Sequence, residues 1–298
     1  MVVLLFLGAG TVHGNEAVPG KRPAAALRAG YAALRDDPRH NPFQRPLYMK
    51  SSEDTFGVNG EIYALVDHPF ATAGAQLGEP SPWCEILLLH LNTKYCRPAS
   101  DGRGTVLKVS IGRKHDQPMD EAHRVNFDYR VIARTANYLH VRLDAAEGPL
   151  GTRDYLIVLE AAPAEGGRTL IRLSYSYAYG MVGRLAMQAY LGTVGRDKVG
   201  FTVLGVDADG RPRYVGGMRG VVERNTMRYY LAIEAFLGTL AVPAQARVER
   251  SLRDWFEASE RHALQLHEIE LGEYLLMKRK EHSRQQADIG SAKAGGGG

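Results

Sequence analysis

The sequence lacks the motifs and the long apolar runs that would identify a common enzyme class or a helical membrane protein. Its 298 residues include only two cysteines, too few for a zinc site built from cysteines. The sequence also contains no GxSxG motif, no HExxH motif and no phosphate-binding loop. Beyond the first 14 residues, no stretch reaches the roughly 18 uninterrupted apolar residues that a transmembrane helix needs. We therefore expect no cofactor, and no catalytic set can be recognised in the sequence.

Positive charge is not concentrated in one region either. The chain carries 37 Lys and Arg against 33 Asp and Glu, a net charge of +4, and the two signs are interleaved through most of its length. Such mixing is typical of a solvated surface and does not favour nucleic-acid binding. With 45% hydrophobic and 23% charged residues, the chain has the composition of a globular protein with a sizeable core.

The N-terminus and the cysteines both favour export. Residues 1–14 are apolar and then small, as in a signal peptide, although basic residues are missing there; the alternative is a buried N-terminal strand. Cys84 and Cys96 are close in sequence, and an isolated pair in an exported protein is most simply a disulfide; the alternative is two reduced thiols in the cytosol. Together these features predict an exported, periplasmic protein.

Strict alternation of apolar and polar residues predicts most of the strands. Along one such run, Ile171, Leu173 and Tyr175 point one way and the intervening residues the other, which is the period of a half-buried strand. Turn residues separate several such runs, so we expect an antiparallel meander with one apolar face. The seven expected strands lie at about 60–67, 93–98, 106–111, 124–131, 139–144, 154–160 and 171–179.

Helical spacing and helix-breaking residues divide the rest of the chain. Residues 15–57 are expected to form an arm, helical at 21–36 and then extended because of several prolines. Ser81 is expected to cap a buried helix, with Pro82 in its first turn. The other expected segments are a short helix at 70–78, a helix and hairpin at 181–215, an apolar-faced helix from Val222 to Leu240, a long charged helix within 241–286 and a disordered tail at 287–298.

This order of elements resembles the helix-grip fold of the START-like superfamily, which includes polyketide cyclases, Bet v 1-type allergens and lipid-transfer domains. The resemblance implies an α+β domain over 58–240, in which a curved antiparallel sheet of about seven strands wraps around the helix from Val222 to Leu240 and encloses an apolar cavity. The helix and hairpin at 181–215 and the additional charged helix after Pro243 depart from that pattern.

Tyrosines on the expected inner face of the sheet are the first candidates for ligand contact. A phenol in an apolar cavity would orient the polar group of a ligand, because a buried hydroxyl seeks a partner. The alternative is that these tyrosines are strand formers in a solid core. The candidate cavity residues are Phe127, Tyr129, Val141, Tyr155, Tyr175, Tyr177, Tyr179, Met227, Tyr230 and Ile233.

Two further patterns, the spacing of two histidines and a group of basic residues after the meander, give little support for a metal site or a membrane contact. His262 and His267 lie near carboxylates but are five residues apart, so they do not share a helix face and no metal site is expected. Basic side chains follow the meander and could contact a membrane surface, although nearby acids favour a solvated face. These basic residues are Arg184, Arg196, Lys198, Arg211, Arg213, Arg219, Arg224 and Arg228.

Three functional hypotheses follow from these patterns. The first is a non-catalytic protein that binds a lipid or another apolar small molecule in a START-like cavity. The second is a cyclase or hydrolase-like enzyme that uses a cavity tyrosine as acid or base, which would need a second titratable group within hydrogen-bond reach. The third is an interaction protein that docks a partner protein through its C-terminal helix.

Overall fold

An open antiparallel sheet of eight strands forms the centre of the protein. The computed structural model describes residues 21–35, 43–100, 102, 104–180 and 198–294. The strand order is β1-β2-β8-β7-β6-β5-β4-β3, so β1 and β3 are the two edges. The strands are β1 (Leu47–Glu53), β2 (Gly57–Val66), β3 (Thr93–Ser100), β4 (Thr105–Ile111), β5 (His123–Thr135), β6 (Tyr138–Glu147), β7 (Thr152–Pro163) and β8 (Thr169–Tyr179).

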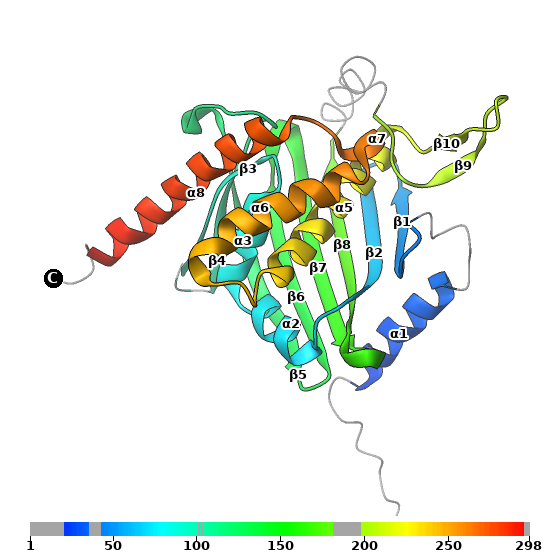
Figure 1. Ribbon diagram of the computed structural model, residues 1–298, viewed down its shortest axis with the longest axis horizontal. Coiled ribbons are helices and arrows are strands. Elements are labelled where there is room, and N and C mark those ends of the chain that lie inside the picture. The colour runs from blue at the N-terminus through cyan, green and yellow to red at the C-terminus, as the bar shows by residue number, and fades with distance from the viewer. Residues whose placement is uncertain (1–20, 36–42, 101, 103, 181–197, 295–298) are drawn as a thin grey trace, which may run out of the picture.

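Helices cover the inner face of this sheet, as the helix-grip prediction requires. The long helix α5 (Gly217–Gly238) packs against β1, β2 and β8, with α2 (Phe70–Leu77) and α3 (Pro80–Leu89) beside it (Figure 1). A side chain at Gly60 of β2 would collide with Thr226 of α5, so the helix lies directly on the strand. The α+β fold, with a curved sheet around a long C-terminal helix, is confirmed.

The first strand of the sheet was not expected from the sequence. The segment around Pro46 was predicted to be an extended arm, but residues 47–53 pair with β2, for example Met49 with Ile62. An extended segment whose residues Leu47, Tyr48 and Met49 are apolar completes its backbone hydrogen bonds by joining a sheet edge. The sheet therefore has eight strands rather than about seven.

The helix of the N-terminal arm lies on the outer face of the sheet. Helix α1 (Lys21–Arg35) buries Ala24 and Leu27 against outward-facing residues such as Tyr63 and Leu170. It therefore covers part of the face that α5 does not. Residues 1–14, where a signal peptide is expected, lie outside the described residues.

Several helix boundaries differ from the expected ones. Helix α3 begins at Pro80, with Glu79 in the capping position and no side-chain cap, so Ser81 is not its N-cap. Helix α5 runs from Gly217 to Gly238 rather than from Val222 to Leu240. The hairpin is confirmed as β9 (Val203–Val206) and β10 (Pro212–Tyr214), whereas the helix expected from residue 181 lies outside the described residues.

The chain after Pro243 folds back in three helices, so the single helix expected within 241–286 is wrong. They are α6 (Ala244–Glu260), α7 (Ala263–Leu266) and α8 (Leu271–Ala294). The break allows Trp255 of α6 to stack on Tyr274 of α8, with ring centroids 5.1 Å apart, which a straight helix could not achieve. Helix α8 extends into the expected disordered tail as far as Ala294, and residues 295–298 lie outside the described residues.

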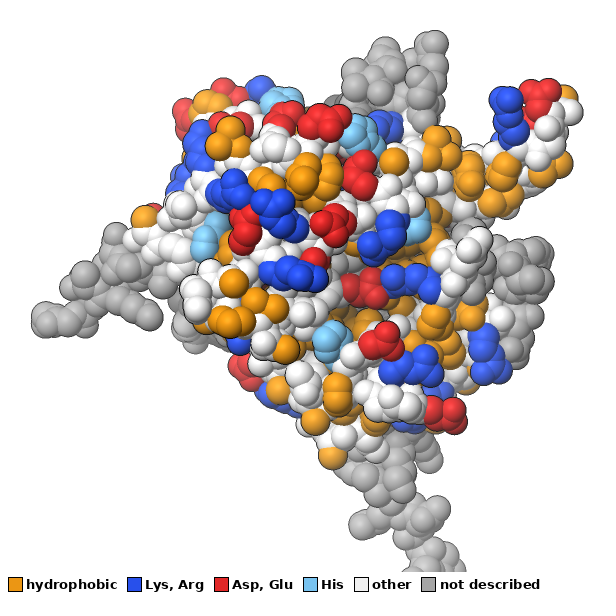
Figure 2. Space-filling view, in the orientation of Figure 1, with side chains coloured by type: hydrophobic (Ala, Val, Ile, Leu, Met, Phe, Trp, Pro, Cys, Tyr) orange, Lys and Arg blue, Asp and Glu red, His pale blue; other side chains and the backbone are white. Residues whose placement is uncertain are grey.

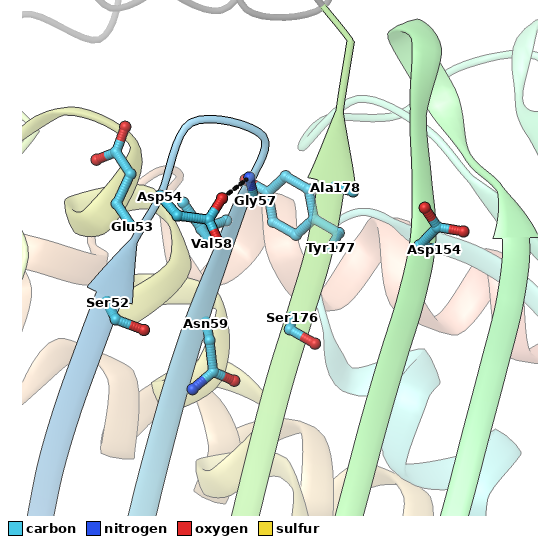
Figure 3. Close-up of a pocket in the computed structure, with 10 residues that line it drawn as sticks. All are labelled: Ser52, Glu53, Asp54, Gly57, Val58, Asn59, Asp154, Ser176, Tyr177 and Ala178. Atoms are coloured by element: carbon cyan, nitrogen blue, oxygen red, sulfur yellow. Dashed lines mark hydrogen bonds between the residues drawn. The ribbon is translucent and has the colours of Figure 1, made fainter.

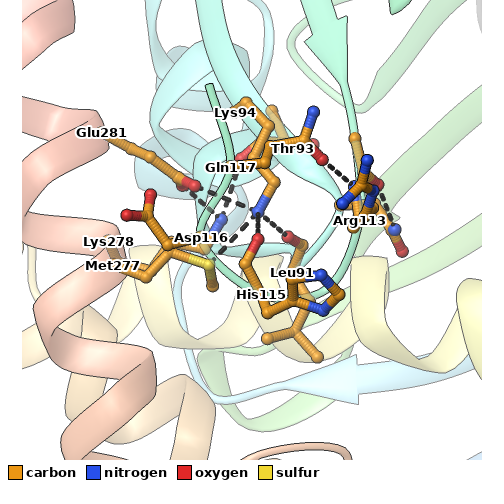
Figure 4. A network of polar contacts seen from close by, with 12 residues as sticks. Leu91, Thr93, Lys94, Arg113, His115, Asp116, Gln117, Met277, Lys278 and Glu281 are labelled. Atoms are coloured by element: carbon orange, nitrogen blue, oxygen red, sulfur yellow. Dashed lines mark hydrogen bonds and ion pairs between the residues drawn. The ribbon is translucent and has the colours of Figure 1, made fainter. Parts of the chain in front are cut away.

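A buried charge network fastens α8 to the loop between α3 and β3 (Figure 4). Lys278 donates to the carbonyl oxygens of His90 and Thr93 at 2.7 and 2.8 Å and to Glu281 at 2.8 Å. Lys94 of β3 forms an ion pair with the other oxygen of Glu281 at 3.1 Å, without the alignment of a hydrogen bond. These three charged side chains are at least 98% buried, so α8 is part of the domain rather than a free helix.

The two cysteines form the expected disulfide. Cys84 of α3 and Cys96 of β3 are bonded, with their Cα atoms 5.1 Å apart, and both are buried. The bridge ties the buried helix to the edge strand β3. Nearby, the Cys96 backbone N–H donates to Gln285 Oε1 of α8 at 3.1 Å, so the bridge and α8 hold the same edge.

Replacing both Cys84 and Cys96 by Ala will lower the free energy of unfolding by about 2 to 3 kcal/mol, because the unfolded chain regains the entropy of a short closed loop. Urea unfolding followed by circular dichroism measures the loss. Adding a thiol reductant to the wild type should reproduce most of it. If the reductant and the double substitution both leave the unfolding midpoint unchanged, the bridge does not contribute to stability.

Candidate functional site

Three tyrosines from two neighbouring strands meet on the inner face of the sheet. Tyr155 of β7 stacks on Tyr177 of β8 with ring centroids 5.3 Å apart, and Tyr175 lies 5.6 Å from Tyr177 and 6.3 Å from Tyr155. Tyr175 and Tyr177 share a face because they are two residues apart on one strand. The alternation in the sequence therefore placed these phenols correctly on the face that α5 covers.

Two residues that the sequence reading missed complete this group. Tyr229 of α5 packs edge-on to Tyr175 at 5.2 Å, and His90 at the end of α3 stacks on Tyr229 at 4.8 Å. Tyr229 lies seven residues after Val222, two helical turns along the face that contacts the sheet, so heptad spacing could have identified it. We call Tyr155, Tyr175, Tyr177, Tyr229 and His90 the tyrosine cluster.

Three of the four tyrosine hydroxyls in the cluster are free to hydrogen-bond a ligand. The hydroxyls of Tyr155 and Thr152 share a hydrogen bond of 2.7 Å, but Tyr175, Tyr177 and Tyr229 have no hydroxyl partner among the described residues. Within that part of the chain, Tyr129 is the one tyrosine whose hydroxyl is both unpartnered and fully enclosed. The three free hydroxyls therefore border space that a molecule the size of water can enter.

Burial keeps the whole cluster uncharged. It raises the pKa values of Tyr175, Tyr177 and Tyr229 well above that of an exposed phenol, and neighbouring phenols such as Tyr155 raise them further. These hydroxyls therefore keep their protons and act as hydrogen-bond donors at any physiological pH.

The imidazole of His90 is neutral for the same reason. Burial lowers its pKa far below the usual range, and the nearby charges of Arg228 and Lys278 lower it further. Its Nδ1 accepts the Asn92 backbone N–H at 3.1 Å, which places the proton on Nε2. That N–H has no aligned acceptor within the described residues, although Asn225 is close enough to raise the pKa slightly.

The other predicted cavity residues are buried, but the structure does not gather all of them at the cluster. Phe127 packs edge-on to Tyr155 at 6.3 Å and Tyr179 lies 6.4 Å from Tyr177. Tyr230 does not join the cluster. Its hydroxyl is hydrogen-bonded to Arg45 and Glu234 instead, at 2.6 and 2.7 Å. The remaining four, Tyr129, Val141, Met227 and Ile233, lie in the hydrophobic core. Their role as ligand contacts stays a prediction.

A surface pocket of about 300 Å³ lies where the ends of β1, β2, β7 and β8 meet (Figure 3). Its rim carries the carboxylates of Glu53, Asp54 and Asp154. Asp54 accepts the backbone N–H of Gly57 at 2.8 Å and so closes the turn between β1 and β2. Tyr177 lines this pocket too, so one residue of the tyrosine cluster borders a recess at the sheet margin.

The basic stretch after the meander is divided between interior and surface. Arg224 and Arg228 are buried in α5, and Arg228 binds Glu268 at 2.8 Å, as do Lys114 and Lys198 at 2.5 and 3.6 Å. Arg211 and Arg213 lie on the exposed hairpin and Arg219 bonds Ser51, while Arg184 and Arg196 lie outside the described residues. The buried arginines cannot contribute to a membrane-facing surface.

No metal site is found among the described residues, where no group of three or more His, Cys, Asp and Glu side chains converges. His267 lies 3.0 Å from Glu260, and His262 instead packs edge-on to Phe201. No helix in the described ranges combines the length and apolar composition needed to cross a membrane.

Comparisons with known proteins return similarity in structure only. No family model and no curated relative matches the chain. Its structure is similar to norcoclaurine synthase from Thalictrum flavum, with 15% identity, coverage of 50% of this chain and 82% of that one, and a TM-score of 0.33. It is also similar to human StAR-related lipid transfer protein 5, with 9% identity, coverage of 57% and 88%, and a TM-score of 0.34.

A third similar structure is the di-domain ARO/CYC protein StfQ of the steffimycin biosynthetic pathway, with 11% identity, coverage of 70% of this chain and 52% of that one, and a TM-score of 0.33. Likenesses at this level concern the fold alone. The helix-grip architecture of this chain is shown by its own element order and by the packing of α5 on the sheet.

Proposed function

We propose that this protein binds a lipid or another apolar small molecule against the tyrosine cluster, without covalent chemistry. The observation that carries the proposal is the set of three neutral, unpartnered hydroxyls of Tyr175, Tyr177 and Tyr229 in an otherwise apolar core. Because these donors face accessible space, a ligand acceptor could bond to them while the surrounding apolar side chains contact the rest of the ligand. The ligand class that fits is an apolar molecule with an uncharged oxygen acceptor, such as a carbonyl, ether or hydroxyl group.

The enzyme hypothesis is less well supported by the same site. Proton transfer requires a phenol hydrogen-bonded to a second titratable group. In the tyrosine cluster, Tyr229 is stacked on His90 rather than hydrogen-bonded to it. Hydrogen-bonded phenol and carboxylate pairs do occur, for example Tyr138 with Glu160, but that pair lies on the outer face of the sheet.

The docking hypothesis for the C-terminal helix is weakened by the packing of α6 and α8. Trp255 and Tyr274 are buried in the hydrophobic core, so deleting residues 243–298 would expose core surface of the remaining domain. Export to the periplasm remains part of the proposal. The buried disulfide supports it, because such bridges persist in oxidising compartments.

The test combines native mass spectrometry with binding of a neutral solvatochromic dye. Protein purified without detergent should retain an apolar molecule, and Nile red, which carries a carbonyl acceptor, should compete for the emptied site. Changing Tyr175, Tyr177 and Tyr229 together to Phe will weaken Nile red binding about fivefold, because roughly 1 kcal/mol of hydrogen bonding is lost while the shape is kept.

Tyr214→Phe on the hairpin is the matched control, and it should leave binding unchanged. Unfolding curves establish that the triple variant is folded. A protein that retains no ligand, together with equal dye binding by wild type and triple variant, would mean that the tyrosines belong to a solid core.

A further inference from the structure

A second recess lies far from the tyrosine cluster, between the outer face of β3, β4 and β5 and the C-terminal half of α8. It has a volume of about 390 Å³. Lys108, Ser110, Arg124 and Asn126 belong to it and alternate with core residues along β4 and β5, so they face outward. Its remaining lining residues are Tyr95, Val109, Met119, Arg284 and Asp288. We call this recess the α8 groove.

Unpaired positive charge distinguishes the α8 groove from other parts of the outer face. Lys108, Arg124 and Arg284 line it, and none of them forms an ion pair within the described residues. On the same face, by contrast, Arg142 binds Asp144 at 2.9 Å and Arg172 binds Glu61 at 3.0 Å. The groove therefore holds an excess of positive charge that the protein itself does not neutralise.

The one acidic side chain that lines the groove, Asp288, lies near the Tyr95 phenol. Burial raises the pKa of the Tyr95 phenol, and the neighbouring carboxylate of Asp288 raises it further. The other polar groups lining the groove, the hydroxyl of Ser110 and the amide of Asn126, can donate hydrogen bonds. Three cations and two neutral donors around one recess form the donor set that suits a tetrahedral dianion.

We propose that the α8 groove binds a phosphate group. Two of the three cations that line it are arginines, whose planar guanidinium groups can bind phosphate oxygens in pairs. The phosphate is carried either by a small soluble ester or by a lipid headgroup, which share this chemistry. This site is separate from the tyrosine cluster and does not depend on the function proposed for it.

The experiment uses the full-length protein and two phosphate sources. Inorganic phosphate is titrated while backbone amide chemical shifts are followed by NMR, with sodium chloride at equal ionic strength as the reference. In parallel, vesicles of phosphatidylcholine, with or without phosphatidic acid, are tested for protein retention by flotation. The variant is the exposed pair Lys108→Gln and Arg124→Gln, and the matched control is Arg130→Gln with Arg142→Gln on the same face.

We expect phosphate, but not chloride, to shift amides near Ser110 and Arg284, with about a tenfold or greater loss of affinity in the Lys108 and Arg124 variant and none in the control. Retention that requires phosphatidic acid and the same two residues, with no response to inorganic phosphate, supports the lipid headgroup as the source. Equal responses of variant and control in both arms, or equal shifts with chloride, overturn the proposal. Thermal unfolding should be the same for both variants, because all four substituted side chains are exposed.

Discussion

Replacing Glu281 by Gln will lower the free energy of unfolding by about 3 to 5 kcal/mol, because it removes the one carboxylate that two buried lysines share. Glu281 is 1% exposed and lies between Lys278 and Lys94, at 2.8 and 3.1 Å from their Nζ atoms. Glutamine keeps the shape and one acceptor but not the charge. Lys278 would then lose the one carboxylate that acts on it, and Lys94 would keep only the attraction of Asp116.

The loss should depend on pH in a defined direction. Burial lowers the pKa of Lys278 from its ordinary value of 10.5 to about 8, against the attraction of Glu281, which raises it. Between pH 8 and 10.5 the unfolded chain binds this proton and the folded protein does not, so stability rises with pH across that window. Without Glu281 the pKa falls further, so the deficit of the variant is largest below the wild-type pKa of about 8 and shrinks as the pH rises through that value.

Urea unfolding at several pH values measures this effect. Glu273→Gln, an exposed position on the same helix, is the matched control and should change stability by less than about 0.5 kcal/mol. A deficit in Glu281→Gln that is small, or that does not decrease as the pH rises, would show that the lysines are adequately solvated in the folded protein.

Replacing Trp255 by Ala will cost about 3 to 5 kcal/mol, the range for deleting a buried large aromatic side chain. Trp255 is 1% exposed, stacks on Tyr274 and donates its indole N–H to the Arg228 carbonyl oxygen at 3.0 Å. It therefore connects α6 to both α5 and α8. Hydrogen exchange should show the loss of protection spreading into α8, beyond the substituted helix.

Trp255→Phe separates packing from hydrogen bonding. It retains an aromatic ring against Tyr274 but leaves the Arg228 carbonyl without its donor, so a smaller loss of about 1 to 3 kcal/mol is expected. An Ala variant that loses no more stability than the Phe variant would contradict the view that α6 and α8 are held to the domain by this ring.

The predictions for Glu281 and Trp255 both treat the segment after Pro243 as part of the domain. The amino-acid sequence alone did not predict this packing. The charges on this segment are interspersed over its exposed side in Figure 2, and this mixture is what the sequence displays most clearly. The buried side chains Trp255, Tyr274 and Lys278 are a minority spread over three helices. A single helical periodicity cannot reveal a chain that turns back between α6 and α8.

The strands were more predictable than the helix boundaries. Seven of them show period two, because each has one face on the core and one in solvent. Strand β1 was missed because Ser51, Ser52 and the prolines before it gave it the appearance of an exposed arm, and its pairing with β2 is a tertiary contact. The disulfide could be predicted because the chain has only two cysteines and they are 12 residues apart in the sequence.

From the sequence alone it followed that Tyr155, Tyr175 and Tyr177 share the inner face of an antiparallel sheet, since side-chain direction along a strand is a local property of the backbone. Only the tertiary structure decided that Tyr229 and His90 meet them and that Tyr230 does not. It also brought Lys108, Arg124 and Arg284 to one groove, although α8 is distant from β4 and β5 in the sequence. Contacts between elements depend on how helices pack on the sheet, and no pattern within a single segment contains that information.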